Sequence, residues 1–523
     1  MLNLQSRTIN HVTMKRIPTI LSAIALSAIA VNAQILRTTC EQGEIEGEPH
    51  NGYALYKAIP YAEAPVGRLR WHAPVKKSPW QGVYKAGNWG DRPMQTNDPN
   101  QSGNSLPMSE DCLYLSVSTP AKDSSERLPV FVNIHGGGFF TGSYSGTQDS
   151  FVKEGIVYCS IGYRLGAFGF MAHPEAAKES DRGIAGNYGL MDQIMALQWI
   201  HDNIARFGGD PDRITICGES AGGISVSVLC ASPLCKGLFR RAICESGGNF
   251  LPVRTGPNTV CGSAQDMAYA QSLGLEFQKA LGCKNLSQMR KLTAKEIQAK
   301  TAYNTYWPVV DGYVITGDTY EAYQKGDYND VDLIVGYNSD EGSLFVHGMG
   351  MDAYRDMART NFPADTEGFA RAFPASNDPE ALQALRDVFR DVAFGWPSWA
   401  WATLQTRTGG RPVYFYYFDQ LSENTIMRGT RGATHVAEMP FIYGFNFGGS
   451  MSQVDTHMSQ IMERYWINFV KTGNPNSTAL PYWTEFRPDT PSVMYMKEGF
   501  FLSTVPNRPQ MDFLESYFSR MRR

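Results

Sequence analysis

One short motif in the sequence places a nucleophile on a sharp turn. Residues 218–222 read GESAG, with Ser220 at the centre, and they connect an apolar stretch at 214–217 to a helix predicted from 220 to 230. Such a strand-to-helix turn is strained and projects the serine hydroxyl outward, and the flanking glycines remove side chains that would collide. A glycine-rich turn with a solvated serine is the alternative interpretation of the same residues.

A second glycine cluster, HGGGF at residues 135–139, lies upstream of the serine and directly follows an apolar run at 128–134. Glycine N–H groups can approach a developing oxyanion because no side chains shield them. We therefore expect Gly137, Gly138 and the N–H of Ala221 to form an oxyanion hole. A phosphate-binding loop is the alternative, but no Lys-Ser or Lys-Thr pair follows the glycines as a P-loop requires.

A nucleophilic serine needs a general base, and a carboxylate must hold that base in place. For a serine on a strand-to-helix turn, the expected order along the chain is serine, then Asp or Glu, then His. Three histidines follow Ser220, and their positions alone do not choose among them: His347, His435 and His457.

The elements that must position these groups alternate between strands and helices. Short apolar runs predict strands, and between 189 and 207 apolar residues recur at helical spacing. The alternation is typical of an α/β fold with a largely parallel sheet. The predicted strands are 128–134, 156–161, 214–217, 241–245 and 333–335.

Residues of about 348–405 differ from the rest, because they are predicted to be mainly helical with proline and glycine breaks. We expect this segment to be an insertion that caps the site. No internal repeat or low-complexity linker divides the chain, so one domain over residues 34–523 is favoured over several.

The first residues have the pattern of a secretory signal. Lys15 and Arg16 follow a second possible start at Met14, an apolar run occupies 17–31, and small residues close it. The run is too short to span a bilayer comfortably. We therefore expect residues 1–33 to be removed from an exported protein, periplasmic or extracellular, without a membrane span. A buried first helix is the alternative.

Composition narrows the classes of function. The 523 residues include 47 Lys+Arg and 51 Asp+Glu, which gives a formal net charge of −4, and 43% are hydrophobic. This composition is that of a globular protein and disfavours a disordered chain. Without a positive excess, a general nucleic-acid-binding function is also disfavoured.

Several further segments resemble the type-B carboxylesterase family, α/β-hydrolases that include cholinesterases, bile-salt lipases and para-nitrobenzyl esterases. The similar segments extend over nearly the whole chain after residue 33, and they are 59–70, 109–116, 162–169, 187–193, 207–211, 466–469 and 473–475. The resemblance implies the α/β-hydrolase fold, with a mostly parallel twisted sheet flanked by helices. It also implies a chemistry that needs no metal and no organic cofactor.

The same resemblance assigns the remaining catalytic residues. The sequence SDEGS matches the family's acid motif and implies that Glu341 is the acid, while GATHVAE matches the histidine motif and implies that His435 is the base. The other two histidines after the serine are then surface or structural residues. Three residues are implied to lie around His435 and to support it or bias its charge: Glu219, Ser246 and Glu438.

Two departures from the family pattern bear on disulfides and specificity. The family usually pairs the cysteine of its Glu-Asp-Cys-Leu signature, here Cys112, with an upstream cysteine, but Pro93 stands at that position. The loop at 95–107 contains no Trp, Tyr or Phe, so a cation–π cage for a choline ester is disfavoured. Cys217 and Cys244 are expected to be free buried thiols. Two further pairings are possible, and the sequence does not decide whether they form: Cys230 with Cys235 and Cys261 with Cys283.

Four aromatic residues are candidates for a substrate pocket, although packing in an aromatic core explains them equally well: Phe139, Phe394, Trp396 and Trp399. The expected function is that of a serine carboxylesterase that hydrolyses small-molecule esters through an acyl-enzyme. A lipase, or an esterase that releases aromatic acids, is the alternative among enzymes. A non-catalytic adhesion protein is the alternative of another class. Acyl and alcohol specificity and oligomeric state are left undetermined.

Overall fold

The computed structural model describes residues 34–95, 106–257, 264–422, 430–445 and 449–522. The expected signal segment at 1–33 and Cys261 lie outside the described residues. Among the helices of this described part, none combines the length and the apolar character needed to cross a membrane.

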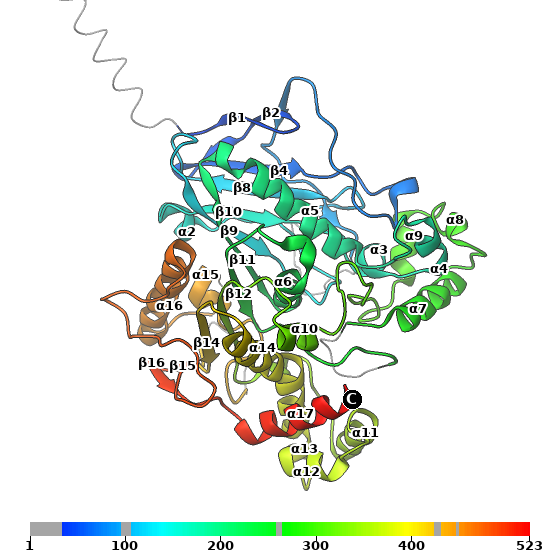
Figure 1. The fold of residues 1–523 in the computed structure, drawn as a ribbon, viewed down its shortest axis with the longest axis vertical. Coiled ribbons are helices and arrows are strands. Elements are labelled where there is room, and N and C mark those ends of the chain that lie inside the picture. The colour runs from blue at the N-terminus through cyan, green and yellow to red at the C-terminus, as the bar shows by residue number, and fades with distance from the viewer. Residues whose placement is uncertain (1–33, 96–105, 258–263, 423–429, 446–448, 523) are drawn as a thin grey trace, which may run out of the picture.

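A sheet of eleven strands forms the centre of the molecule (Figure 1). Its middle strands run parallel, and strands at both edges run antiparallel to their neighbours, which confirms the predicted α/β fold. From one edge to the other, the order is β16 (Phe500–Ser503), β15 (Val493–Met496), β14 (Val413–Phe418), β13 (Asp332–Asn338), β12 (Arg241–Glu245), β11 (Gly209–Glu219), β9 (Leu128–Ile134), β10 (Val157–Ile161), β8 (Tyr114–Thr119), β4 (Tyr53–Pro60) and β3 (Glu48–His50).

The five strands predicted from apolar runs correspond to β9, β10, β11, β12 and β13. The prediction was too short for β11, which begins at Gly209 and pairs with β9 through a register shift between Gly209 and Ile214. The added residues are mostly polar, so a search for apolar runs does not detect them.

Helices cover both faces of the sheet (Figure 1). Side chains alternate along β9, so Val130 and Val132 join the core on one face and Phe131 joins the core on the other. The first face packs against α5 (Tyr188–Asn203), α6 (Ala221–Ala231) and α14 (Trp396–Thr408), and the second against α2 (Asp149–Lys153), α15 (Met439–Tyr443) and α16 (Gln453–Thr472).

The segment between β13 and β14 is mainly helical. The short 3-10 turn η4 (Glu341–Leu344) packs against α13 (Asp378–Arg390), and Arg390 of α13 donates a hydrogen bond to the Ser339 carbonyl at 3.1 Å. A Cβ on Gly342 would collide with the α13 backbone, so the turn and the helix are in close contact. The helical elements are α11 (Met351–Asn361), α12 (Thr366–Ala372), α13 (Asp378–Arg390) and the π-helical turn η5 (Asp391–Gly395), which continues into α14.

Eight cysteines lie in the described residues, and all eight are free thiols. Cys230 and Cys235 therefore do not form the disulfide that the sequence left open. Cys217 and Cys244 are buried free thiols, as predicted.

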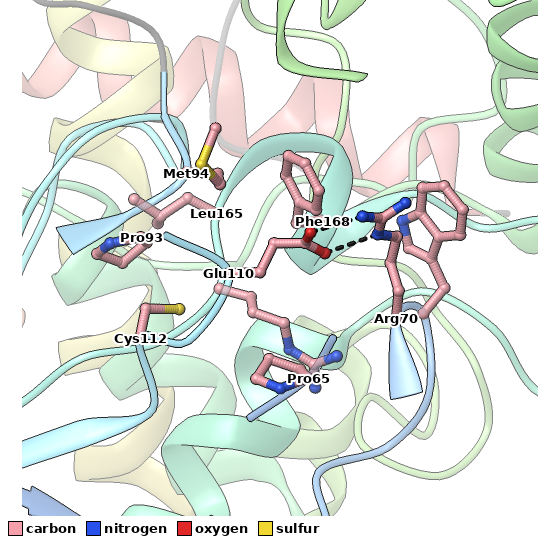
Figure 2. A pocket seen from close by; sticks show the side chains of 10 residues that line it. Pro65, Arg70, Pro93, Met94, Glu110, Cys112, Leu165 and Phe168 are labelled. Atoms are coloured by element: carbon pink, nitrogen blue, oxygen red, sulfur yellow. Dashed lines mark hydrogen bonds and ion pairs between the residues drawn. The ribbon is translucent and has the colours of Figure 1, made fainter. Parts of the chain in front are cut away.

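The cysteine of the Glu-Asp-Cys-Leu segment lies beside a proline. Cys112 and Pro93 line the same small cavity of about 10 Å³ (Figure 2). The ion pair between Arg70 and Glu110, 2.6 Å long, forms another part of its wall. The residue that faces this cavity together with Cys112 is thus a proline, which offers no sulfur for a disulfide.

A buried ion pair joins two segments that resemble the esterase family. Arg164 donates to the Asp192 carboxylate through Nε at 2.8 Å and through Nη2 at 2.7 Å, and its backbone N–H donates to the same group at 3.1 Å. Both side chains are almost completely buried. The pair fixes the start of α5 against the loop after β10.

We predict that Asp192→Ala lowers the free energy of unfolding by about 3–5 kcal/mol, because it leaves the Arg164 charge buried without a partner. Urea unfolding followed by tryptophan fluorescence measures the change. Asp352→Ala, which breaks an exposed pair with Arg355, is the control and is expected to leave the transition in place. Equal midpoints for the two variants would contradict the role given to the buried pair.

Candidate active site

Ser220 lies on the turn between β11 and α6. Its φ of 58° and ψ of −122° are unusual for a residue with a side chain. A Cβ on Gly222 would collide with the Ile134 carbonyl, and a Cβ on Gly218 would collide with the Gly222 backbone. Glycine on both sides of the serine is therefore a steric requirement of this turn.

The HGGGF loop packs directly against the serine turn. A Cβ on Gly136 would lie 2.5 Å from a β11 carbonyl oxygen and 3.2 Å from the serine Cβ. Gly137 and Gly138 have φ values of 95° and 63°, in the left-handed region that glycine tolerates. Within the described chain, no acceptor takes the N–H groups of Gly137, Gly138 or Ala221. Intramolecular hydrogen bonds among the described residues therefore leave the three predicted oxyanion donors free to bind an oxyanion.

His435 and Glu341 meet at the same edge of the sheet. His435 Nδ1 lies 2.6 Å from Glu341 Oε2. The other carboxylate oxygen, Oε1, accepts hydrogen bonds from Ser246 Oγ at 2.6 Å and from the N–H of Asn338 at 2.7 Å. Because a carboxylate accepts from Nδ1–H, the neutral imidazole keeps an unprotonated Nε2 that can serve as a base.

The second ring nitrogen of His435 faces a different carboxyl group. His435 Nε2 lies 3.1 Å from Glu219 Oε1. The Ser220 hydroxyl makes no hydrogen bond to any residue that the structure describes. The structure thus brings His435, Glu341 and Glu219 into direct contact, while the serine hydroxyl is not bonded to the imidazole.

Asn338, which no sequence motif indicated, connects the acid to the histidine loop. Its backbone N–H donates to Glu341, and its side-chain amide donates to the Thr434 carbonyl at 2.9 Å and to Glu438 Oε2. Asn338 is the last residue of β13, three positions before Glu341. Only its place at the end of that strand could have indicated this role.

Several residues of the candidate site have strained backbone conformations. Ser246 and Val436 have positive φ values of 49° and 66°, as does Ser220. A β-branched residue rarely adopts this conformation, and Val436 directly follows His435. Tertiary contacts must therefore hold the histidine loop in place.

Two phenylalanines contact the His435 ring. Phe394 of η5 stacks on it with ring centres 4.7 Å apart and planes at 19°, and Phe345 lies 5.1 Å away at 58°. Phe394 is one of the predicted pocket candidates, whereas no sequence motif indicated Phe345. Because 41% of Phe345 is exposed, the imidazole lies beside an apolar surface that solvent can reach.

The other three aromatic candidates contact residues outside the triad. Phe139 is fully buried and packs against Phe170 and Trp307. Trp396 is fully buried and stacks on Tyr320. Trp399 lines a separate cavity of about 200 Å³ near the start of α17 (Arg508–Met521).

Comparison with known proteins identifies the family. The sequence pattern of the carboxylesterase family matches residues 32–514. The chain belongs to the carboxylesterase family. It is 32% identical to the para-nitrobenzyl esterase of Bacillus subtilis (strain 168), over 92% of this chain and 98% of that protein. It is 33% identical to the phenmedipham hydrolase of Pseudarthrobacter oxydans, over 89% of this chain and 95% of that one.

Solved structures agree with the sequence relatives. A structure of PNB esterase superimposes with a TM-score of 0.80 at 28% identity, covering 91% of this chain and 99% of the other. The α/β-hydrolase fold implied by the resemblance is therefore confirmed, and this carboxylesterase is a carboxylic ester hydrolase.

Buried carboxyl groups control the charge of the histidine in this carboxylesterase. Burial by itself lowers the pKa of His435, but the charges of Glu219 and Glu341 outweigh it and raise that pKa to about 9. Burial raises the pKa of Glu219 to about 8, although the charge of His435 opposes the change. Burial also holds the pKa of Glu438 well above its ordinary value. The site therefore favours the imidazolium that forms when His435 accepts a proton.

We predict that Glu219→Gln moves the rise of kcat/KM with pH toward lower pH. Only the deprotonated imidazole can act as the base, so the rise follows the pKa of His435 in the free enzyme. Removing one of the negative charges that raise this pKa lowers it. Hydrolysis of para-nitrophenyl butyrate over a pH series measures the shift, with the exposed Glu367→Gln as the control. A rise that stays in place or moves to higher pH would be inconsistent with this effect of Glu219.

We also predict that Ser246→Ala lowers kcat by roughly tenfold and changes KM little, since Glu341 loses one hydrogen bond that fixes its orientation. Steady-state kinetics test this. Ser225→Ala, which removes a buried hydroxyl bonded to Gln193 instead, is the matched control. Wild-type kcat in a folded Ser246→Ala enzyme would show that Glu341 does not need this contact.

Proposed function

We propose that the enzyme hydrolyses carboxylic esters through a Ser220–Glu341–His435 triad and an acyl-enzyme intermediate. The observation that carries the proposal is the 2.6 Å contact from His435 Nδ1 to Glu341, at the sheet edge where the strained serine turn packs on the glycine loop. Ser220 Oγ attacks the ester carbonyl while His435 Nε2 takes its proton. Glu341 orients the ring and stabilises its charged form.

The N–H groups of Gly137, Gly138 and Ala221 stabilise the tetrahedral oxyanion, and each donor of this kind is typically worth about 3–4 kcal/mol in the barrier. His435 then protonates the departing alcohol. Water attacks the acyl-enzyme with His435 again as the base, and Ser220 is restored. Before the first step, the Ser220 hydroxyl must replace Glu219 at His435 Nε2, so substrate binding includes a local change of contact.

The apolar surface beside His435 favours an apolar acyl group. Its exposed part consists of Phe345 and Leu344, which are 41% and 37% exposed, and the buried ring of Phe394 lies behind Phe345. Short and medium apolar acyl chains therefore fit the proposal, and activity on micellar long-chain esters would favour the lipase alternative.

We also propose that the chain forms one hydrolase domain with a helical insertion and that it is exported. The large sheet takes strands from before and after the helical segment, which supports one hydrolase domain with an insertion at about 348–405. The basic and apolar pattern of residues 1–33 supports export. N-terminal sequencing of the protein recovered outside the cytoplasm tests the cleavage site.

Replacing the nucleophile gives the decisive test. We predict that Ser220→Ala lowers kcat for para-nitrophenyl butyrate by roughly 10⁴-fold or more and abolishes labelling by a fluorophosphonate probe. Ser125→Ala, in an exposed loop, is the control and is expected to keep both properties. Substantial hydrolysis by a folded Ser220→Ala variant would rule out the triad.

A further inference from the structure

A cavity of about 200 Å³ lies next to the serine turn, on the face of the sheet that α15 and α16 cover. Gly136 of the oxyanion loop and the side chains of Glu219 and Glu245 line it. Ser145 and Gly146 also line it and are exposed, so the cavity opens to the surface. The mechanism above does not use this space.

Small polar side chains at the ends of two central strands leave the cavity open. Phe131 on β9 pairs in register with Tyr158 on β10, and the two rings stack 5.8 Å apart. Two residues further along, the paired residues are Asn133 and Ser160. Asn133 is only half-buried although β9 is a central strand, and it lines the cavity together with Ser160. The change from two rings to an amide and a hydroxyl creates the space.

The two carboxyl groups differ in how well they are satisfied. Glu219 and Glu245 are register partners on β11 and β12, with exposed fractions of 8% and 1%. Glu245 Oε1 accepts hydrogen bonds from Tyr443 and Trp466, each at 2.7 Å. Glu219 Oε1 accepts none from the described residues, although it lies 3.1 Å from His435 Nε2. Glu245 is thus held by two hydrogen-bond donors, whereas Glu219 has acceptor capacity beyond its contact with His435.

A second unused acceptor belongs to His135. Its Nδ1 lies 3.0 Å from the Gly136 carbonyl oxygen, so Nδ1 donates and Nε2 carries the lone pair of the neutral ring. Burial lowers the pKa of His135 to about 4, which keeps the ring neutral. In the described structure, Nε2 has no hydrogen-bond partner. Because a buried acceptor without a donor is costly, a molecule in this cavity that carries donor groups is favoured over one that carries none.

We propose that this cavity binds the alcohol portion of the ester, and that the preferred substrates carry free hydroxyl groups on that portion. The inference rests on the proposed function. Gly136 links the two places, since its backbone packs against Ser220 and also lines the cavity. Hydroxyl groups can donate to Glu219 and accept from the amide of Asn133, whose hydrogen bond to Ser160 Oγ is long at 3.5 Å, whereas an apolar alcohol offers these groups no further partner.

Three butyrate esters test the proposal with the acyl group held constant: ethyl, 3-methylbutyl and 2,3-dihydroxypropyl. The wild-type enzyme is expected to have a higher kcat/KM for the 2,3-dihydroxypropyl ester than for the 3-methylbutyl ester of similar size. Asn133→Phe fills the cavity and is expected to lower the ratio of kcat/KM for dihydroxypropyl over ethyl ester by roughly tenfold or more. Ser160→Leu fills it from the neighbouring strand and is expected to lower the same ratio.

Thr403→Phe is the matched control, because Thr403 lines the separate cavity of about 200 Å³ beside Trp399, and the ratio should stay at the wild-type value. Fluorophosphonate labelling of each variant shows that its active site has folded. A labelled Asn133→Phe enzyme with an unchanged ratio would overturn the inference, as would a wild-type preference for the 3-methylbutyl ester. Failure of the wild-type enzyme to label would instead overturn the triad itself.

Discussion

The backbones of two loops approach so closely at the carboxyl edge of the sheet that no side chain fits between them. Ile134 and Gly218 are register partners at the ends of β9 and β11, and the loops that follow these strands pack on each other through Gly136 and Gly222. A methyl group at either glycine would force the loops apart. The position of Ser220 relative to the oxyanion donors depends on this contact, and therefore on the parallel pairing of two central strands.

The charged groups of the active site also meet at this edge of the sheet. Several buried carboxyl groups surround one imidazole, and burying like charges together is unfavourable unless hydrogen bonds compensate. Glu341 receives hydrogen bonds from Ser246 and Asn338, and Glu245 receives hydrogen bonds from Tyr443 and Trp466. Glu219 has no such compensation and contacts His435 directly. Its charge is therefore the one most easily changed by whatever enters the site.

Local patterns made part of this arrangement predictable. The serine turn, the glycine loop and the five central strands follow from short-range features: glycines at sharp turns and apolar runs that end at them. The acid and the base did not follow from spacing, because three histidines remained open until a family resemblance selected His435. Asn338 and Phe345 act through contacts with residues distant along the chain, and no local pattern carries that information. The sequence likewise could not tell which aromatic residue of this segment contacts the site: Phe394 stacks on His435, whereas Trp396 packs in the core.

The free thiols affect how the protein responds to unfolding. Burial raises the pKa of most of these cysteines, among them Cys159, Cys217 and Cys244, so little thiolate exists while the chain is folded. These buried thiols therefore react slowly with oxidants while the chain is folded. Unfolding exposes these thiols together, and non-native disulfides formed between them would keep the chain from refolding. In an oxidising compartment, the lifetime of the enzyme is set by how rarely it unfolds, and the barrier to unfolding matters more than the equilibrium stability.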